Sequence, residues 1–213
     1  ASLTEDLVVA LPPSNLVALE KAPDGQYYFA VGVRAFPTLK RQLPLPQRLA
    51  VLWDASGSRS GQAHDGEYAV LESFFARFRE PKFTVDLIVF RNAAEQPVRF
   101  EIAGGDCSAL IGALKAVAYD GGTQLSAAVL PPDIKPDLVF LFTDGLSNFG
   151  TPEPARLDRP HIVVSGAAGA DHTYLKYLAM KSGGQYFNLA RATPEEAAAA
   201  WTPAFLFREA KST

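Results

Sequence analysis

The chain has 213 residues, of which 48% are hydrophobic and 20% charged, which is enough apolar material for one domain of ordinary size with an appendage. Its formal net charge of −3 gives no reason to expect nucleic acid or an anionic membrane as a partner, because both favour a basic surface. No apolar run approaches the roughly 20 residues needed to cross a bilayer, and the single cysteine excludes an intrachain disulfide.

The first part of the chain, residues 1–44, is predicted to form a β hairpin followed by a linker. Extended segments at about residues 15–22 and 26–36 flank the turn "PDG", in which proline presets φ and glycine supplies a positive φ. A two-stranded hairpin alone is only marginally stable in water, so we expect it to pack against the main domain or against a partner outside this sequence. The prolines of "PTLKRQLPLPQ" indicate an extended linker.

After residue 45, strand and helix patterns alternate. Continuous apolar runs, which suit parallel strands covered on both faces, occupy residues 48–54, 84–90, 137–144 and 161–166. Amphipathic helices are predicted at residues 66–79, 106–118 and 171–181, and a last one opens with a capping box at Thr193 and Glu196. Residues 95–103 alternate and contain Pro97, so we expect an antiparallel edge strand there. The sum is an open, mostly parallel, doubly wound α/β sheet with helices on both faces.

Oxygen-bearing side chains follow the strands of this sheet at three places. Asp54, Ser56 and Ser58 come directly after the first parallel strand, Thr123 lies in a later loop, and Asp144 ends the strand "DLVFLFTD". Ligand sites of such sheets lie beyond the carboxyl ends of the strands, so we expect these side chains to converge. Hydroxyl and carboxylate oxygens suit Mg²⁺, whereas Zn²⁺ prefers His or Cys. The alternative is a helix N-cap and loop network without a metal.

The segments "DASGS", "DGGTQL" and "FTDG", in this order, resemble the three loops of the von Willebrand factor A domain family. The metal-ion-dependent adhesion site of that family has the pattern Asp-x-Ser-x-Ser, then Thr, then Asp. The resemblance covers about residues 47–200, including "YLKYLAMKSGGQYFNL", which is similar to the family's helix, glycine pair and last strand. It implies Mg²⁺, with Mn²⁺ or Ca²⁺ as alternatives, bound by these residues: Ser56, Ser58 and Thr123 through hydroxyls, and Asp54 and Asp144 directly or through water.

The N-terminal part of the chain carries a second resemblance. "PDGQYYFAVGVRAFP" is similar to the stretch that joins a vault/inter-alpha-trypsin-inhibitor domain to its A domain. We therefore expect a hairpin extension and linker at 1–44, an A-type domain at 45–203, and a strand and tail at 204–213. The segment "AFLFRE" is expected to pair with or lie beside the hairpin, and exposed β edges of this kind invite dimerisation. The chain begins at Ala1, so we expect a processed or excised piece; its location stays open, and the resemblance favours an extracytoplasmic or cell-surface one.

The sequence also contains an arginine directly after the motif and three histidines. Family members often carry Met after the second serine, where this chain has Arg59, so we expect a cation near the rim of the site that tunes partner choice or weakens the metal. The three histidines, His64, His161 and His172, are expected at the surface or flanking strands, because none has a metal-ligand spacing.

Enzyme classes fit the motif poorly. A haloacid-dehalogenase type phosphatase needs a second acid where Ser56 stands, and a serine hydrolase needs serine where Arg59 occupies the centre of "GSRSG". No phosphate-binding loop is present. We therefore expect no enzymatic activity and a metal-dependent protein-recognition module, in which a carboxylate of a partner protein fills the open Mg²⁺ position. The alternative is a structural module whose metal site is filled by a neighbouring domain of the same full-length protein.

Overall fold

The computed structural model of the chain describes residues 16–21, 23, 25–32, 45–148, 150, 154 and 157–200. The chain divides into two compact units, Ala1–Gln42 and Leu43–Thr213. In the first unit, β1 (Leu16–Lys21) and β2 (Tyr27–Gly32) pair antiparallel, as predicted. The predicted strand 204–209 and the linker lie outside the described residues, apart from the linker's last three residues, and the domain boundaries stay a prediction.

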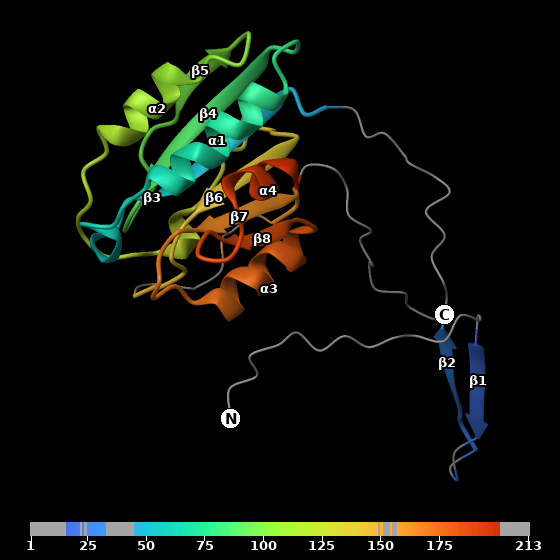
Figure 1. The fold of residues 1–213 in the computed structure, drawn as a ribbon. Helices are drawn as coiled ribbons and strands as arrows, with labels where there is room; N and C mark the ends of the chain where they lie inside the picture. Colours follow the sequence, from blue (N-terminus) through green and yellow to red (C-terminus); the bar gives the residue numbers. More distant parts are fainter. Residues whose placement is uncertain are drawn as a thin grey trace. The chain divides into compact units, whose positions relative to one another are not determined.

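The second unit is built on a sheet with the order β5-β4-β3-β6-β7-β8 (Figure 1). Its strands are β3 (Arg48–Asp54), β4 (Phe83–Phe90), β5 (Val98–Ile102), β6 (Leu138–Phe142), β7 (His161–Ser165) and β8 (Gln185–Asn188). Every neighbouring pair is parallel except β4 and β5. This confirms the mostly parallel sheet and the antiparallel edge strand, which begins directly after Pro97 because proline cannot donate to the ladder of a central strand.

The helices agree with the sequence patterns apart from their ends. They are α1 (Asp65–Arg77), α2 (Ser108–Lys115), α3 (His172–Ser182) and α4 (Pro194–Ala199), with 3₁₀ turns at Gly57–Arg59 and Leu125–Ala127. The glycine that ends α3, Gly183, has a left-handed φ of 79°, and the capping box of α4 forms as predicted.

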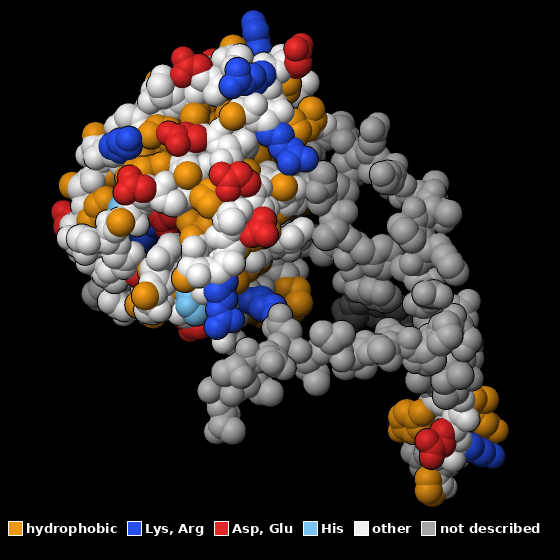
Figure 2. Space-filling model, viewed as in Figure 1, with side chains coloured by type: hydrophobic (Ala, Val, Ile, Leu, Met, Phe, Trp, Pro, Cys, Tyr) orange, Lys and Arg blue, Asp and Glu red, His pale blue; other side chains and the backbone are white. Residues whose placement is uncertain are grey.

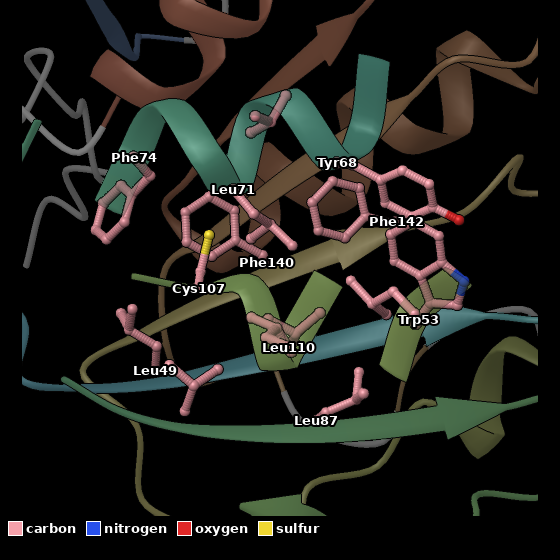
Figure 3. Close-up of a cluster of buried hydrophobic side chains, with 14 of the residues drawn as sticks. Leu49, Trp53, Tyr68, Leu71, Phe74, Leu87, Cys107, Leu110, Phe140 and Phe142 are labelled. Atoms are coloured by element: carbon pink, nitrogen blue, oxygen red, sulfur yellow. The ribbon is translucent and has the colours of Figure 1, made fainter. Parts of the chain in front are cut away.

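The core consists of two layers, one on each face of the sheet, because successive side chains of β3 point in opposite directions. Leu49, Val51 and Trp53 pack on the face covered by α1, α2 and α4. Ala50 and Leu52 pack on the other face, against α3 and the segment that includes Leu125–Ala127. Figure 3 shows the first layer, with side chains of α1 directed toward those of the sheet. Trp53 is buried in the core, as predicted.

The order of the strands determines where a ligand site can form. From β3 the chain moves to β4 on one side, and it later returns to β6 on the other side of β3. Such a reversal opens a crevice at the carboxyl ends of the two strands, because their following loops diverge. Asp54 ends β3, and Asp144 lies two residues after β6. The topology therefore places both predicted acids at the carboxyl edge of the sheet, where the strand order reverses.

The surface of the larger unit carries charges of both signs. On the face shown in Figure 2, basic and acidic side chains are interspersed rather than gathered by sign. This face lacks the clustered lysines and arginines on which nucleic-acid binding depends. Within the described ranges, no helix has both the length and the apolar character required to traverse a bilayer.

Candidate metal site

The first loop of the candidate site begins at the buried end of β3. The Asp54 carboxylate is completely buried and both of its oxygens accept hydrogen bonds. Oδ1 accepts from the backbone N–H of Ser56 at 3.0 Å, and Oδ2 accepts from the Thr143 hydroxyl at 2.6 Å. These bonds hold the carboxylate in one orientation at the edge of the sheet.

The serines connect this loop to the loop after β6. Ser56 is buried and Ser58 is exposed, and their Oγ atoms lie 3.1 Å apart. The Ser58 hydroxyl donates to Asp144 Oδ2 at 2.6 Å, while Asp144 Oδ1 accepts from the backbone N–H of Leu146 at 3.0 Å. Four of the predicted ligands, Asp54, Ser56, Ser58 and Asp144, are therefore joined in one chain of hydrogen bonds.

The fifth predicted ligand lies in a loop that is bonded to both of the others. The Gly57 N–H donates to Gly121 O at 3.0 Å, and the Asn148 N–H donates to Thr123 O at 2.9 Å. Thr123 is buried, and within the described part of the chain its Oγ1 has no hydrogen-bond partner. A buried hydroxyl without a partner is rare, because it loses its bonds to water without replacement. A metal ion bound beside Thr123 would satisfy this oxygen.

The chemistry of the donors fits a hard divalent cation. In the parts of the chain that the structure describes, no three His, Cys, Asp or Glu side chains are grouped closely enough to hold a metal ion. The candidate site instead combines two carboxylates with three hydroxyls. Oxygen donors of this kind suit Mg²⁺, Mn²⁺ or Ca²⁺ better than Zn²⁺. The residues present therefore fit the metal that the sequence motif implies.

The position of Asp54 affects its charge. Burial raises the pKa of this carboxyl above its ordinary value, because the anion loses its hydration. The positive charge of Arg59 and the hydrogen bonds from Thr143 and Ser56 offset part of that rise. A cation bound at the site would favour the ionised form further.

The sequence-based expectation that Arg59 lies near the rim of the site is wrong. Arg59 is completely buried, and its Nη1 donates to Asp54 O at 2.6 Å and to Phe142 O at 3.1 Å. Its Nη2 forms an ion pair with Glu67 of α1, and the guanidinium lies 5.0 Å from the centre of the Trp53 ring. The 3₁₀ turn at Gly57–Arg59 directs the side chain inward. Arg59 therefore cannot touch a partner protein.

The expectation for His64 is also wrong. This residue is buried, its Nδ1 lies 2.8 Å from Glu67 Oε2, and its ring stacks on Tyr119 with the centroids 4.6 Å apart. The three-residue spacing of His64 and Glu67 at the start of a helix was the available signal. His161 is buried at the first residue of β7, which agrees with the expected place beside a strand, whereas His172 is half-buried at the first residue of helix α3 and does not.

The sequence motif did not assign a role to Thr143. This buried residue donates to Asp54 Oδ2 and accepts from the N–H of Gly145 at 3.1 Å. It thereby connects the two acidic loops. Its place directly before Asp144, at the end of a parallel strand, is the signal that indicates this role.

Replacing Gly57 by alanine should weaken metal binding. A Cβ atom at this position would lie 2.9 Å from Gly121 O, so the first two loops of the site must separate to admit it. We expect a loss of stability of about 1–3 kcal/mol and a weaker affinity for Mn²⁺ in calorimetric titration. Gly112→Ala is the matched control, because nothing lies within 4 Å of a Cβ there. Equal affinities in the two variants would show that the close approach of the loops is not needed.

Comparisons with known proteins support the fold. No protein-family model matches the chain, and no curated protein matches it in sequence. The chain is similar to the structure of an aerotolerance-related membrane protein from Bacteroides fragilis, with a TM-score of 0.50, 14% identity, and coverage of 73% of this chain and 97% of that one. It is also similar to a von Willebrand factor type A structure from Catenulispora acidiphila, with a TM-score of 0.51, 17% identity, and coverage of 73% and 41%.

Identities this low show the fold alone, and the chain spans less than half the length of the second structure. The sheet order, the helices on both faces and these two likenesses agree with one another. The second unit of the chain has the von Willebrand factor A fold.

Proposed function

We propose that the chain is a metal-dependent protein-recognition module of the adhesion type. In this proposal the ligands of one divalent cation are Asp54, Ser56, Ser58, Thr123 and Asp144, and a carboxylate of a partner protein completes its coordination. The observation that carries the proposal is the buried Thr123 hydroxyl, which has no hydrogen-bond partner among the described residues. It lies in a loop bonded to the two loops that carry the other ligands.

The charge of the site favours an acidic partner. Three of the proposed ligands are neutral hydroxyls, and the two carboxylates already accept hydrogen bonds from protein groups. The bound cation would act as a Lewis acid that holds a further oxygen anion. Ser58 is the exposed member of the set, so the partner reaches the site from the side on which Ser58 meets solvent.

The proposal is non-enzymatic. A catalytic serine needs a general base that removes its proton, commonly a histidine. The Ser58 hydroxyl donates instead to Asp144, and the Nδ1 of His64 is directed to Glu67. These contacts support binding rather than acyl or phosphoryl transfer.

The N-terminal hairpin supports a second candidate, an interdomain module. Leu19, Tyr27 and Tyr28 are all at least 60% exposed, although a two-stranded hairpin needs an apolar partner for stability. A neighbouring domain of the same full-length protein, such as one of the vault/inter-alpha-trypsin-inhibitor type, would supply that partner. In that case the acid that completes the metal site belongs to the same polypeptide.

Two titrations test the proposal. Calorimetric titration of the EDTA-treated chain with Mg²⁺ and Mn²⁺ should give binding heat that disappears in Asp54→Ala. Acetate added in an amide NMR experiment should then shift the signals of Ser58 and Leu146 only when Mg²⁺ is present. No heat with either metal would refute the metal site, and acetate shifts without Mg²⁺ would refute the role of the cation.

The metal should stabilise the fold in a manner that depends on pH. The pKa of Asp54 in the folded chain lies above its unfolded value of 3.8 because of burial. Without metal, this group therefore contributes stability below that value, which is lost as the pH rises through the folded pKa. Metal binding needs the ionised form, so the stabilisation by Mg²⁺ should be largest at neutral pH and vanish as the pH falls through the raised pKa.

Thermal melts with Mg²⁺ or with EDTA, from about pH 4 to about pH 8, measure this dependence. We expect the two melting temperatures to converge at the acid end and to separate toward neutral pH. A separation that is the same across the whole range would show that no carboxylate titrates with metal binding.

A further inference from the structure

A buried cluster of two charged side chains and a histidine lies next to the candidate metal site. It consists of Arg59, His64 and Glu67, all of which have less than a tenth of their surface exposed. Arg59 follows the Asp-x-Ser-x-Ser segment, and the other two come from the start of α1. We call these three residues the Arg59 cluster. Charged side chains are rarely buried to this degree unless each is paired, because the loss of hydration is costly.

Arg59 joins the ends of the two strands that lead to the acids. Register pairing between β3 and β6 stops at Trp53 and Phe142, so the ladder no longer holds the strands together beyond that pair. At this point the Nη1 of Arg59 donates to Asp54 O at 2.6 Å and to Phe142 O at 3.1 Å. One nitrogen therefore bridges the carbonyls of both strands where the acidic loops begin.

The guanidinium is itself held in place by the rest of the cluster. Its Nη2 is paired with Glu67 Oε2 and lies 3.1 Å from His64 Nδ1, which is itself 2.8 Å from Glu67 Oε2. Glu67 Oε1 accepts from the N–H of Gly166 at 3.2 Å, directly after β7. The face of the Trp53 ring lies against the guanidinium. The cluster thus connects α1 to the carboxyl ends of three adjacent strands of the sheet.

From these contacts we infer that Arg59 is a positioning residue, which sets the separation of the loops that begin at Asp54 and at Asp144. Glu67 and His64 hold the guanidinium group in the orientation in which it donates to the two carbonyls. The consequence for metal affinity rests on the proposed function. The effect on the two loops does not, because it follows from the contacts of the metal-free chain.

The positioning effect of Arg59 can be separated from the effect of its charge, because the two change the metal affinity in opposite directions. The positive charge of Arg59 repels a cation, so its removal alone should tighten metal binding. Loss of the bridge between β3 and β6 should weaken metal binding, because the ligands are no longer held at one separation. A pair of substitutions that leaves the net charge unchanged cancels the effect of charge, so that only the loss of the bridge between β3 and β6 is measured.

The main variant is therefore Arg59→Met with Glu67→Gln, which removes one charge of each sign. The amide introduced by Glu67→Gln can still accept from the N–H of Gly166, and its NH2 group can donate to His64 Nδ1 in the tautomer that leaves this nitrogen free to accept. The matched control is Arg99→Met with Asp86→Asn, which removes the ion pair of 2.8 Å between β5 and β4, away from the loops of the site. Arg59→Lys is a further variant, because it keeps the charge but loses the planar fork.

Amide hydrogen exchange in the metal-free chain is the deciding measurement. The N–H groups of Ser56 and Leu146 are bonded to the two acids, so their exchange reports on the two loops separately. We expect both to exchange about tenfold faster or more in the main variant and in Arg59→Lys, and to be unchanged in the control. If the main variant does not fold, Arg59→Lys decides. Unchanged exchange at both residues in the folded Arg59 variants overturns the inference. Faster exchange in the main variant together with unchanged exchange in Arg59→Lys overturns it as well.

Titration with Mn²⁺ then distinguishes this inference from the proposed function. If the wild type binds Mn²⁺, the Arg59 variants should bind it about 10- to 100-fold more weakly, and the control should bind it equally well. Unchanged or tighter binding in the folded Arg59 variants would contradict the inference for metal affinity. If the wild type binds no metal while exchange still rises in the Arg59 variants, the proposed function fails and the positioning role stands.

Discussion

Replacing Asp144 by asparagine is expected to weaken Mg²⁺ and Mn²⁺ binding by more than about 100-fold, a larger effect than the loss of a group that only supports a ligand. The substitution keeps the shape of the side chain, so an oxygen still accepts from the N–H of Leu146. The substitution removes half of the negative charge of the candidate site, and the new amide NH2 group can no longer accept from the Ser58 hydroxyl. The melting temperature of the metal-free chain should change little, because the bond from the N–H of Leu146 is kept and the repulsion between two like charges without a metal is relieved.

The matched control for this variant is Asp120→Asn. Asp120 is an acid of the second loop, but its side chain is 76% exposed and paired with Arg91. Removing its charge should leave the metal affinity within about threefold, because exposed charges are screened by solvent. Calorimetric titration of both variants measures the difference. Similar losses in the two would indicate a general effect of negative charge rather than a specific ligand at Asp144.

Arg59→Met alone is expected to be the most destabilising substitution near the site. It leaves Glu67 buried without its cationic partner, and breaking a buried pair in this way costs about 3–5 kcal/mol. For a chain of this size that corresponds to a fall in melting temperature of roughly 6–20 °C. Urea denaturation followed by circular dichroism gives the free energy of unfolding directly.

Two further variants identify the cause of this loss. Adding Glu67→Gln should recover most of the stability, because the uncompensated charge is then removed as well. Arg77→Met, an exposed arginine of the same helix α1, should cost much less. If Arg59→Met lowers the free energy of unfolding no more than Arg77→Met does, the ion pair with Glu67 contributes little to stability, and the Arg59 cluster does not hold the fold as described.

The place of the two acids at the edge of the sheet could be predicted because it depends on local patterns. The apolar run that ends at Asp54 indicates a buried parallel strand, and the carboxyl ends of such strands share one edge. The order of the strands then places the loop after β6 beside the loop after β3. Sequence reasoning therefore located the residues at the edge, although their role as metal ligands stays a prediction.

The place of Arg59 could not be predicted in the same way. An arginine in a loop of small polar residues suggests solvent exposure, since a buried arginine is rare. Its burial depends on acceptors that are distant in the sequence, Phe142 O and the Glu67 carboxylate. Only the folded chain brings these groups together. For His64, the contact with Glu67 had a local signal in the three-residue spacing, but the stacking on Tyr119 did not, because Tyr119 comes from the loop after α2.

Helix α2 illustrates a smaller limit of the sequence patterns. Its apolar spacing predicted residues 106–118, but the helix spans Ser108–Lys115. At the start, the Asp106 carboxylate accepts from the N–H of Ser108 and forms a turn that precedes the helix. At the end, Val117 still packs on the core after the helical bonds have stopped. Apolar periodicity reports burial, which continues beyond the hydrogen-bonded helix.

The central claim is that one divalent cation is bound where the three loops meet, and a crystal grown with Mn²⁺ tests it most directly. The anomalous difference map should show a single strong peak with the Oγ atoms of Ser56, Ser58 and Thr123 as ligands, and with Asp54 and Asp144 bound directly or through water. A peak elsewhere, or a map without a peak at these hydroxyls at saturating Mn²⁺, would contradict the account.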